Sequence, residues 1–127
     1  MLGSNGFDTN PTGLADLLSH HERLQQWLAD QDEPLSHDSR GLARVEARID
    51  GWRADPLIRP QLGNEIGTYL GRVIVASVPG AVWTVWPNGH PVVTLTSGRH
   101  IDVVALAARH VTSGAPSLTS VLEAAGR

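Results

Sequence analysis

The sequence predicts an α+β fold in which helices pack on a small two- or three-stranded antiparallel β-meander. Gly63, Gly67 and Gly71 recur every four residues. This spacing places three bare positions along one face of a helix, where another backbone can approach closely. Farther along, hydropathy alternates on both sides of the turn at residues 87–90, which is the pattern of two antiparallel strands. A helix laid on a small sheet accounts for both features.

Length and composition favour one soluble domain. The chain has 127 residues, a formal net charge of −3 and no cysteine. The acidic balance argues against general nucleic-acid binding, which needs a basic excess. The lack of cysteine excludes disulfides, thiol catalysis and cysteine-ligated zinc. All ten basic side chains are arginine, which indicates either a GC-rich genome or a surface built for carboxylates and phosphates.

We expect a flexible N-terminal arm over residues 1–11 and a single α+β domain over residues 12–127. The arm is polar and rich in Gly, Asn and Thr. It lacks the basic and apolar regions of a signal peptide. No apolar stretch approaches the roughly 18 residues that span a bilayer. The prediction is therefore a cytoplasmic protein without membrane contact.

Three helices are expected before the strands. Thr12 can cap the first, whose apolar positions recur at helical spacing to Leu28. Either Ser36 or Asp38 can cap the second, and the glycine-bearing third runs from about residue 61 to residue 77. Three glycines inside a helix cost roughly 2–3 kcal/mol relative to alanine. A cost of this size predicts that the bare face is used, either for close contact with the sheet or the first helix, or for a ligand lying against the backbone.

Strands are expected at residues 81–86 and 92–97, with a short third strand at 100–103. In the second strand, Val93 and Leu95 belong to the buried face, whereas Thr94 and Thr96 belong to the wetter one. Asp102 or Val103 then begins a helix that Gly114 closes. A last short helix follows Pro116.

Histidine placement decides the enzyme question, because no other likely metal ligand or nucleophile activator is present. Adjacent His20 and His21 point about 100° apart on a helix and cannot grip one ion together. His100 and Asp102 share a strand face, but His90 lies about 15–20 Å away at the opposite end. No nucleophile elbow, glycosidase-like carboxylate pair or phosphate-binding loop is present. We predict no catalytic residue, no metal and no cofactor.

The leading hypothesis is a non-enzymatic protein-interaction module, acting as an adaptor or subunit. Trp83 and Trp86 lie on opposite faces of one strand, so one of them is exposed unless both faces are covered. The partner is an unidentified protein, and an open sheet edge could also support a homodimer. The candidate binding residues lie on the wetter strand face and the two turns: Trp86, Asn88, His90, Thr94, Thr96 and Arg99.

Two alternatives remain open. The first is a small-ligand or enzymatic site between the glycine-bearing helix and the sheet, lined by Glu65, Tyr69, His100 and Asp102. There Glu65 or His100 would act as a base and Tyr69 as a hydrogen-bond donor. The second is a toxin-neutralising immunity protein, which small size, acidity and cytoplasmic character support.

Three segments carry a resemblance to a known family. They are LGNEIGTYLG at residues 62–71, WPNGHPVV at residues 86–93, and SGRHIDV at residues 97–103. The chain resembles an uncharacterised family of small actinobacterial proteins, and the similarity extends from Leu42 to Leu122. The resemblance implies a high-GC Gram-positive source. It supplies no activity and no catalytic residue.

Overall fold

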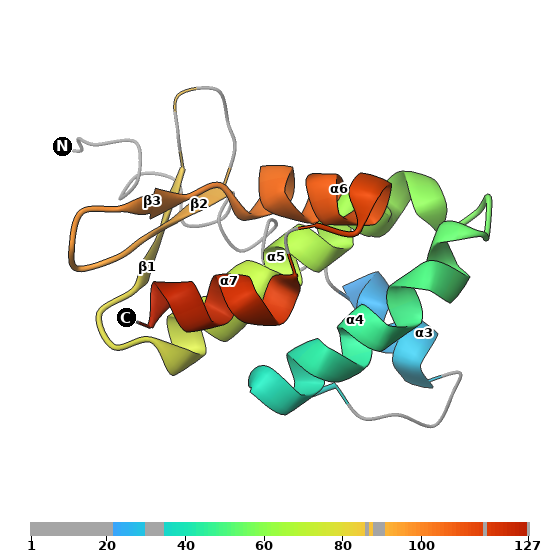
Figure 1. Ribbon diagram of the computed structural model, residues 1–127, viewed down its shortest axis with the longest axis horizontal. Helices are drawn as coiled ribbons and strands as arrows, with labels where there is room; N and C mark the ends of the chain where they lie inside the picture. The colour runs from blue at the N-terminus through green and yellow to red at the C-terminus, as the bar shows by residue number, and fades with distance from the viewer. Residues whose placement is uncertain (1–21, 30–34, 86, 88–90, 116, 127) are drawn as a thin grey trace, which may run out of the picture.

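The α+β prediction is confirmed by the computed structural model, which describes residues 22–29, 35–85, 87, 91–115 and 117–126 (Figure 1). Within these residues the chain forms five helices and one three-stranded sheet. In chain order the elements are α3 (Glu22–Ala29), α4 (Ser39–Arg53), α5 (Arg59–Ser77), β1 (Val82–Val85), β2 (Pro91–Thr94), β3 (His100–Ile101), α6 (Val103–Ser113) and α7 (Leu118–Ala125). The arm expected at residues 1–11 lies outside the described residues.

The sheet is an antiparallel meander in the order β1-β2-β3. Trp83 pairs with Val93, and Val93 pairs with Ile101, so these three residues form one row across the sheet. All three are buried in the hydrophobic core, together with Leu95. The alternation in the sequence therefore predicted the core face of β2, and the structure assigns Trp83 of β1 to the same core.

The second and third strands end earlier than expected because a turn and a helix cap take their ends. Beyond β2, the Leu95 N–H donates to the carbonyl of Arg99, and Gly98 closes the turn with φ +88°. Only glycine adopts such a left-handed conformation without strain. After β3, the Asp102 carboxylate accepts a 3.1 Å hydrogen bond from the Ala105 N–H and so begins α6.

Helix α5 is the centre of the molecule and contacts α3, α4, α6, α7, β1 and β2. It begins at Arg59, two residues earlier than expected. Pro60 is compatible with this start because the first helical turn needs no intrahelical N–H donor. Of the helices described, none has the length and apolar character needed to cross a membrane.

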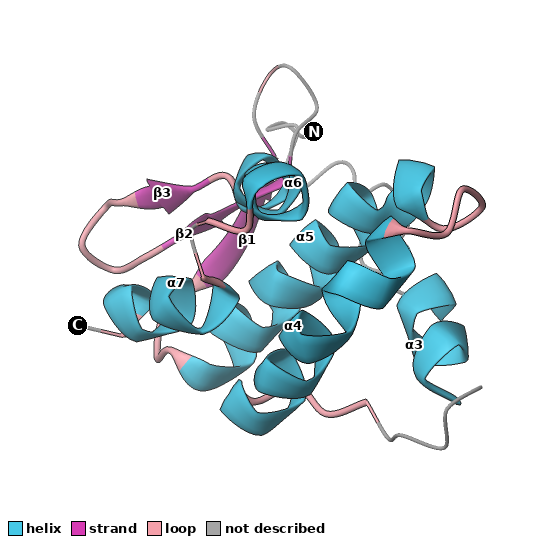
Figure 2. Cartoon of the chain, turned by 45° about the vertical axis from the view of Figure 1, so that its right-hand side comes forward, coloured by secondary structure: helices cyan, strands magenta, loops and turns pink. Residues whose placement is uncertain are grey.

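The three glycines of α5 meet α6 and the sheet, and not the first helix. A Cβ at Gly67 would lie 2.7 Å from the Cα of Val104 in α6, and one at Gly71 would overlap the Trp83 indole. At Gly63 a Cβ would make ordinary contact, 3.5 Å from Ala108. The glycines thus let α6 and β1 approach the α5 backbone. Figures 1 and 2 show α3 on the far side of the molecule from the sheet.

Candidate functional site

The sheet face turned away from the core carries a row of polar and apolar side chains. Val82 pairs with Thr94, and Thr94 pairs with His100. The Thr94 hydroxyl lies 2.9 Å from the Thr84 hydroxyl and 2.9 Å from Nδ1 of His100. Val82, on the edge strand β1, is 52% exposed. We call these four residues, Val82, Thr84, Thr94 and His100, the outer row. Val92 pairs with Thr84 on the same face of the sheet and is fully buried, so only the part of this face around Val82 and His100 is open.

The other predicted binding residues extend this surface in part. Thr96 and Arg99 are both exposed and lie on the turn between β2 and β3. The Thr96 side chain also lies against Gly80 at the end of the α5–β1 connection. Trp86, Asn88 and His90 lie outside the described residues. Trp83, the other tryptophan of this region, is a core residue.

The alternative pocket does not assemble, because its four residues lie at separate places. Glu65 and Tyr69 are each two residues from Gly67, which turns them about 160° around α5 from the glycine face. The Glu65 carboxylate accepts a 3.1 Å hydrogen bond from the Leu24 N–H of α3. His100 belongs to the outer row of the sheet, and Asp102 caps α6. The structure therefore corrects the expectation of one pocket shared by these residues.

Tyr69 has a structural partner of its own. Its hydroxyl donates a 2.6 Å hydrogen bond to the carbonyl of Ser36, in the segment that leads into α4. Its side chain is fully buried in the core. Burial raises the pKa of Tyr69, and the nearby negative charge of Asp38 adds to this effect. A phenol with this pKa stays protonated at neutral pH and serves to hold the Ser36 segment in place.

Carboxylates recur at the first turns of the helices. Asp38 caps α4 through the Gly41 N–H at 2.9 Å, and Asp102 caps α6. Glu65 serves α3 from the middle of α5, and Glu46 accepts a 3.2 Å hydrogen bond from the Thr119 N–H of α7. The first N–H groups of a helix need acceptors from outside the helix, and a negative charge near them also suits the helix dipole.

The capping role of these carboxylates limits the reactions in which they can take part. The Gly41 N–H, followed by the Ser36 hydroxyl, lowers the pKa of Asp38. The capping carboxylates are therefore placed as hydrogen-bond acceptors for the backbone. Among the residues that the structure describes, no three His, Asp or Glu side chains come together as metal ligands.

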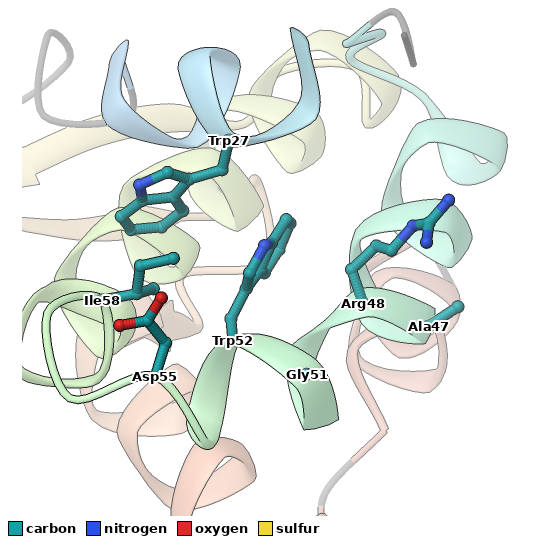
Figure 3. Close-up of a pocket in the computed structure, with 7 residues that line it drawn as sticks. All are labelled: Trp27, Ala47, Arg48, Gly51, Trp52, Asp55 and Ile58. Atoms are coloured by element: carbon teal, nitrogen blue, oxygen red, sulfur yellow. The ribbon is translucent and has the colours of Figure 1, made fainter. Parts of the chain in front are cut away.

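A cleft between α3 and α4 was not predicted from the sequence. It has a volume of about 410 Å³ and is lined by Trp27, Ala47, Arg48, Gly51, Trp52, Asp55 and Ile58 (Figure 3). The rings of Trp27 and Trp52 contact each other at a centroid distance of 5.6 Å and an angle of 49°. Trp27 and Trp52 lie on different helices, and no motif in the sequence marks them as walls of one cleft.

Gly51 forms part of this cleft without a packing role in the described chain. A Cβ at this position would meet no atom within 4 Å beyond its own stretch of helix. Glycine inside a helix costs roughly 0.5–1 kcal/mol relative to alanine. Helix α4 therefore carries a bare backbone position on the cleft wall that its own fold does not require.

The fold and these surfaces define a small α+β domain with one face of its sheet covered by helices. The chain belongs to the family of unknown function DUF6278, which matches residues 2–126. The resemblance to an uncharacterised family is thereby confirmed. Neither a curated protein nor a solved structure matches the chain.

Proposed function

We propose that this protein is a non-enzymatic protein-interaction module that contacts its partner through the outer row of the sheet and the β2–β3 turn. One observation carries the proposal. The core-facing row of the sheet is buried under helices, whereas the opposite row presents Val82, 52% exposed, beside Thr94 and His100. Arg99 stands at the rim of this surface, and arginine is among the residue types enriched at protein interfaces.

The charge at the rim favours a partner with carboxylates. Arg99 is exposed on the turn directly before His100. An arginine can hold a carboxylate through two parallel hydrogen bonds, which adds geometric specificity. The edge strands β1 and β3 also offer backbone groups that a partner strand, or a second copy of the chain in a homodimer, could extend.

The roles of the acids support a binding function over catalysis. Glu65, the base of the alternative pocket, accepts from the Leu24 backbone, and Asp102 caps α6. A general base needs reach to a substrate proton, and these carboxylates are aimed at the backbone. The proposal includes a cytoplasmic setting and an actinobacterial source, in keeping with a chain that has no cysteine and no lysine. An immunity protein would be one form of such a module.

The test is capture of partners by the tagged full-length chain from extracts of its native host. Arg99→Glu and Val82→Arg place opposite or new charges on the proposed surface. We expect both to abolish a stoichiometric partner while the circular dichroism spectrum and Tm stay unchanged. Trp86→Ala should weaken capture in the same way without unfolding the chain.

The chain offers a matched control for Val82. Leu57 is 80% exposed in the connection between α4 and α5, so Leu57→Arg makes the same kind of change away from the sheet. Loss of the partner on Leu57→Arg, with capture retained by Val82→Arg, would move the interface away from the sheet and overturn the proposal. Light scattering of the pure chain distinguishes a homodimer from a second protein.

A further inference from the structure

We propose that the cleft between α3 and α4 binds a planar aromatic amine, such as an amino-substituted heterocycle. This site is separate from the sheet surface and does not depend on the proposed function. The volume of about 410 Å³ lies within the range of small-molecule pockets. Its walls combine the indoles of Trp27 and Trp52 with the charged side chains of Arg48 and Asp55, so an aromatic surface and polar groups meet in one cleft.

The two tryptophans point to a planar ligand. Trp52 rises from α4 and is almost fully buried, whereas Trp27 reaches down from α3 and is half-buried (Figure 3). Their rings meet at a tilt of 49°, so a ligand ring does not fit between them and stacks beside them instead. Flat π-systems favour such offset or tilted contacts with an indole.

Gly51 also favours a planar ligand, on the same wall of the cleft as Trp52. Its backbone lies next to Trp52 on the cleft, and a Cβ there would have free space around it. A flat ring can therefore approach the helix backbone at Gly51 while its edge lies against Trp52. A methyl group at this position would occupy the space of the ring, even though the unliganded fold has room for it.

The carboxylate of Asp55 favours a ligand that carries an amino group. The Asp55 side chain stands beside Ile58 below Trp27 (Figure 3). One carboxylate oxygen accepts a 2.8 Å hydrogen bond from the Leu57 N–H, which fixes the side chain. A carboxylate has acceptor sites for several hydrogen bonds, so it can also accept from an exocyclic amino group. Arg48 lines the other end of the cleft, past Trp52.

Three small molecules test the planar ring and the amino group separately. Adenine has the planar ring and the amino group, purine has the ring alone, and cyclohexylamine has an amine without a planar ring. Titrations of the full chain are followed by NMR of the indole N–H signals, which are assigned by Trp→Phe substitution. We expect saturable shifts of Trp27 and Trp52 with adenine, at a Kd on the order of 1 mM or tighter. Purine should bind more weakly, and cyclohexylamine should give no saturable shift.

Two variants test the wall and the acceptor. Gly51→Ala should raise Tm by about 2–4 °C and weaken adenine binding at least about tenfold. Gly126→Ala is the matched control, because its Cβ meets only ordinary contacts outside the cleft and should leave binding unchanged. Asp55→Asn keeps an oxygen for the Leu57 N–H, and it should bring the adenine and purine affinities together.

The outcomes that overturn the proposal are equally definite. Absence of a saturable adenine shift up to about 5 mM would exclude the ligand class. A shift at Trp83 without one at Trp27 and Trp52 would place binding elsewhere. Unchanged adenine affinity in Gly51→Ala would show that the bare backbone position takes no part in binding. Equal affinities of the native chain for adenine and purine would remove the role assigned to Asp55.

Discussion

The Leu24 N–H in the first turn of α3 donates a 3.1 Å hydrogen bond to Oε1 of Glu65, which lies 41 residues farther along the chain. Glu65 is buried on α5, and Leu24 is buried in the core beside it. The bond therefore gives this buried helix N–H a carboxylate acceptor. It also joins α3 to the central helix, and with it the wall of the cleft that carries Trp27.

The Glu65–Leu24 bond predicts different outcomes for two substitutions. Glu65→Gln keeps an oxygen that can accept from Leu24, so we expect a modest loss of stability, about 1 kcal/mol. Glu65→Leu removes the carboxylate acceptor of the buried Leu24 N–H, and we expect a larger loss, about 1–3 kcal/mol. Urea unfolding measures both values, and Glu123→Leu on the exposed face of α7 is the control. A Glu65→Leu variant as stable as the native chain would contradict the capping role.

Sequence reasoning found the local caps and missed the long-range ones, for a physical reason. Asp38 and Asp102 cap helices that begin next to them, so spacing alone identified both as candidates. Glu65 and Glu46 reach helices 41 and 73 residues away. Such contacts depend on how α5 and α4 pack, and a single carboxylate within a helical pattern carries no mark of its distant partner.

The glycines of α5 predict an ordered series of stabilities. Gly67→Ala would place a Cβ 2.7 Å from the Val104 backbone, and packed helices cannot yield there without a shift. We expect a loss of about 1–3 kcal/mol, as for other overpacked sites. Gly63→Ala makes only ordinary contact, 3.5 Å from Ala108, and gains helix propensity. It should be neutral or stabilising by up to about 1 kcal/mol. Thermal unfolding gives the order, and a stable Gly67→Ala would contradict the close α5–α6 approach.

The candidate sites were less predictable than the fold. Alternation in β2 assigned Val93 and Leu95 to the core because a strand has only two faces, whereas it left open which of Trp83 and Trp86 is buried. The pocket of Glu65, Tyr69, His100 and Asp102 failed on helix geometry, since a residue two positions from Gly67 cannot share its face. To predict the cleft at Trp27 and Trp52, one would need to know the angle at which α3 packs on α4. The sequence pattern places each tryptophan on its own helix and says nothing of that angle.

The pKa of Asp38 predicts part of the loss of stability at acid pH. The hydrogen bond from the Gly41 N–H, with that of the Ser36 hydroxyl, lowers its pKa from the ordinary 3.8. The unfolded chain therefore takes up this proton first as the pH falls, and the stabilisation is present above about pH 4 and lost below it. Asp38→Asn keeps a cap without the charge. Urea midpoints of the two chains should differ most near pH 6 and converge toward pH 2, and a constant difference would contradict the assignment.

The pKa of Tyr69 predicts how stability changes at alkaline pH, and the composition makes this effect easy to isolate. The chain has one tyrosine, no cysteine and only arginine as a basic side chain, so Tyr69 is the one side chain expected to titrate between about pH 9 and 11.5. Burial raises its pKa above the ordinary 10.0, so the unfolded chain loses this proton first and stability falls as the pH rises above about 10. The slope is at most about 1.4 kcal/mol per pH unit, the value for one proton. Tyr69→Phe should cost about 1 kcal/mol at pH 8, through loss of the bond to Ser36, and should abolish the slope. Urea unfolding from pH 8 to 11.5 measures both effects, and a slope that persists in Tyr69→Phe would place the alkaline transition elsewhere.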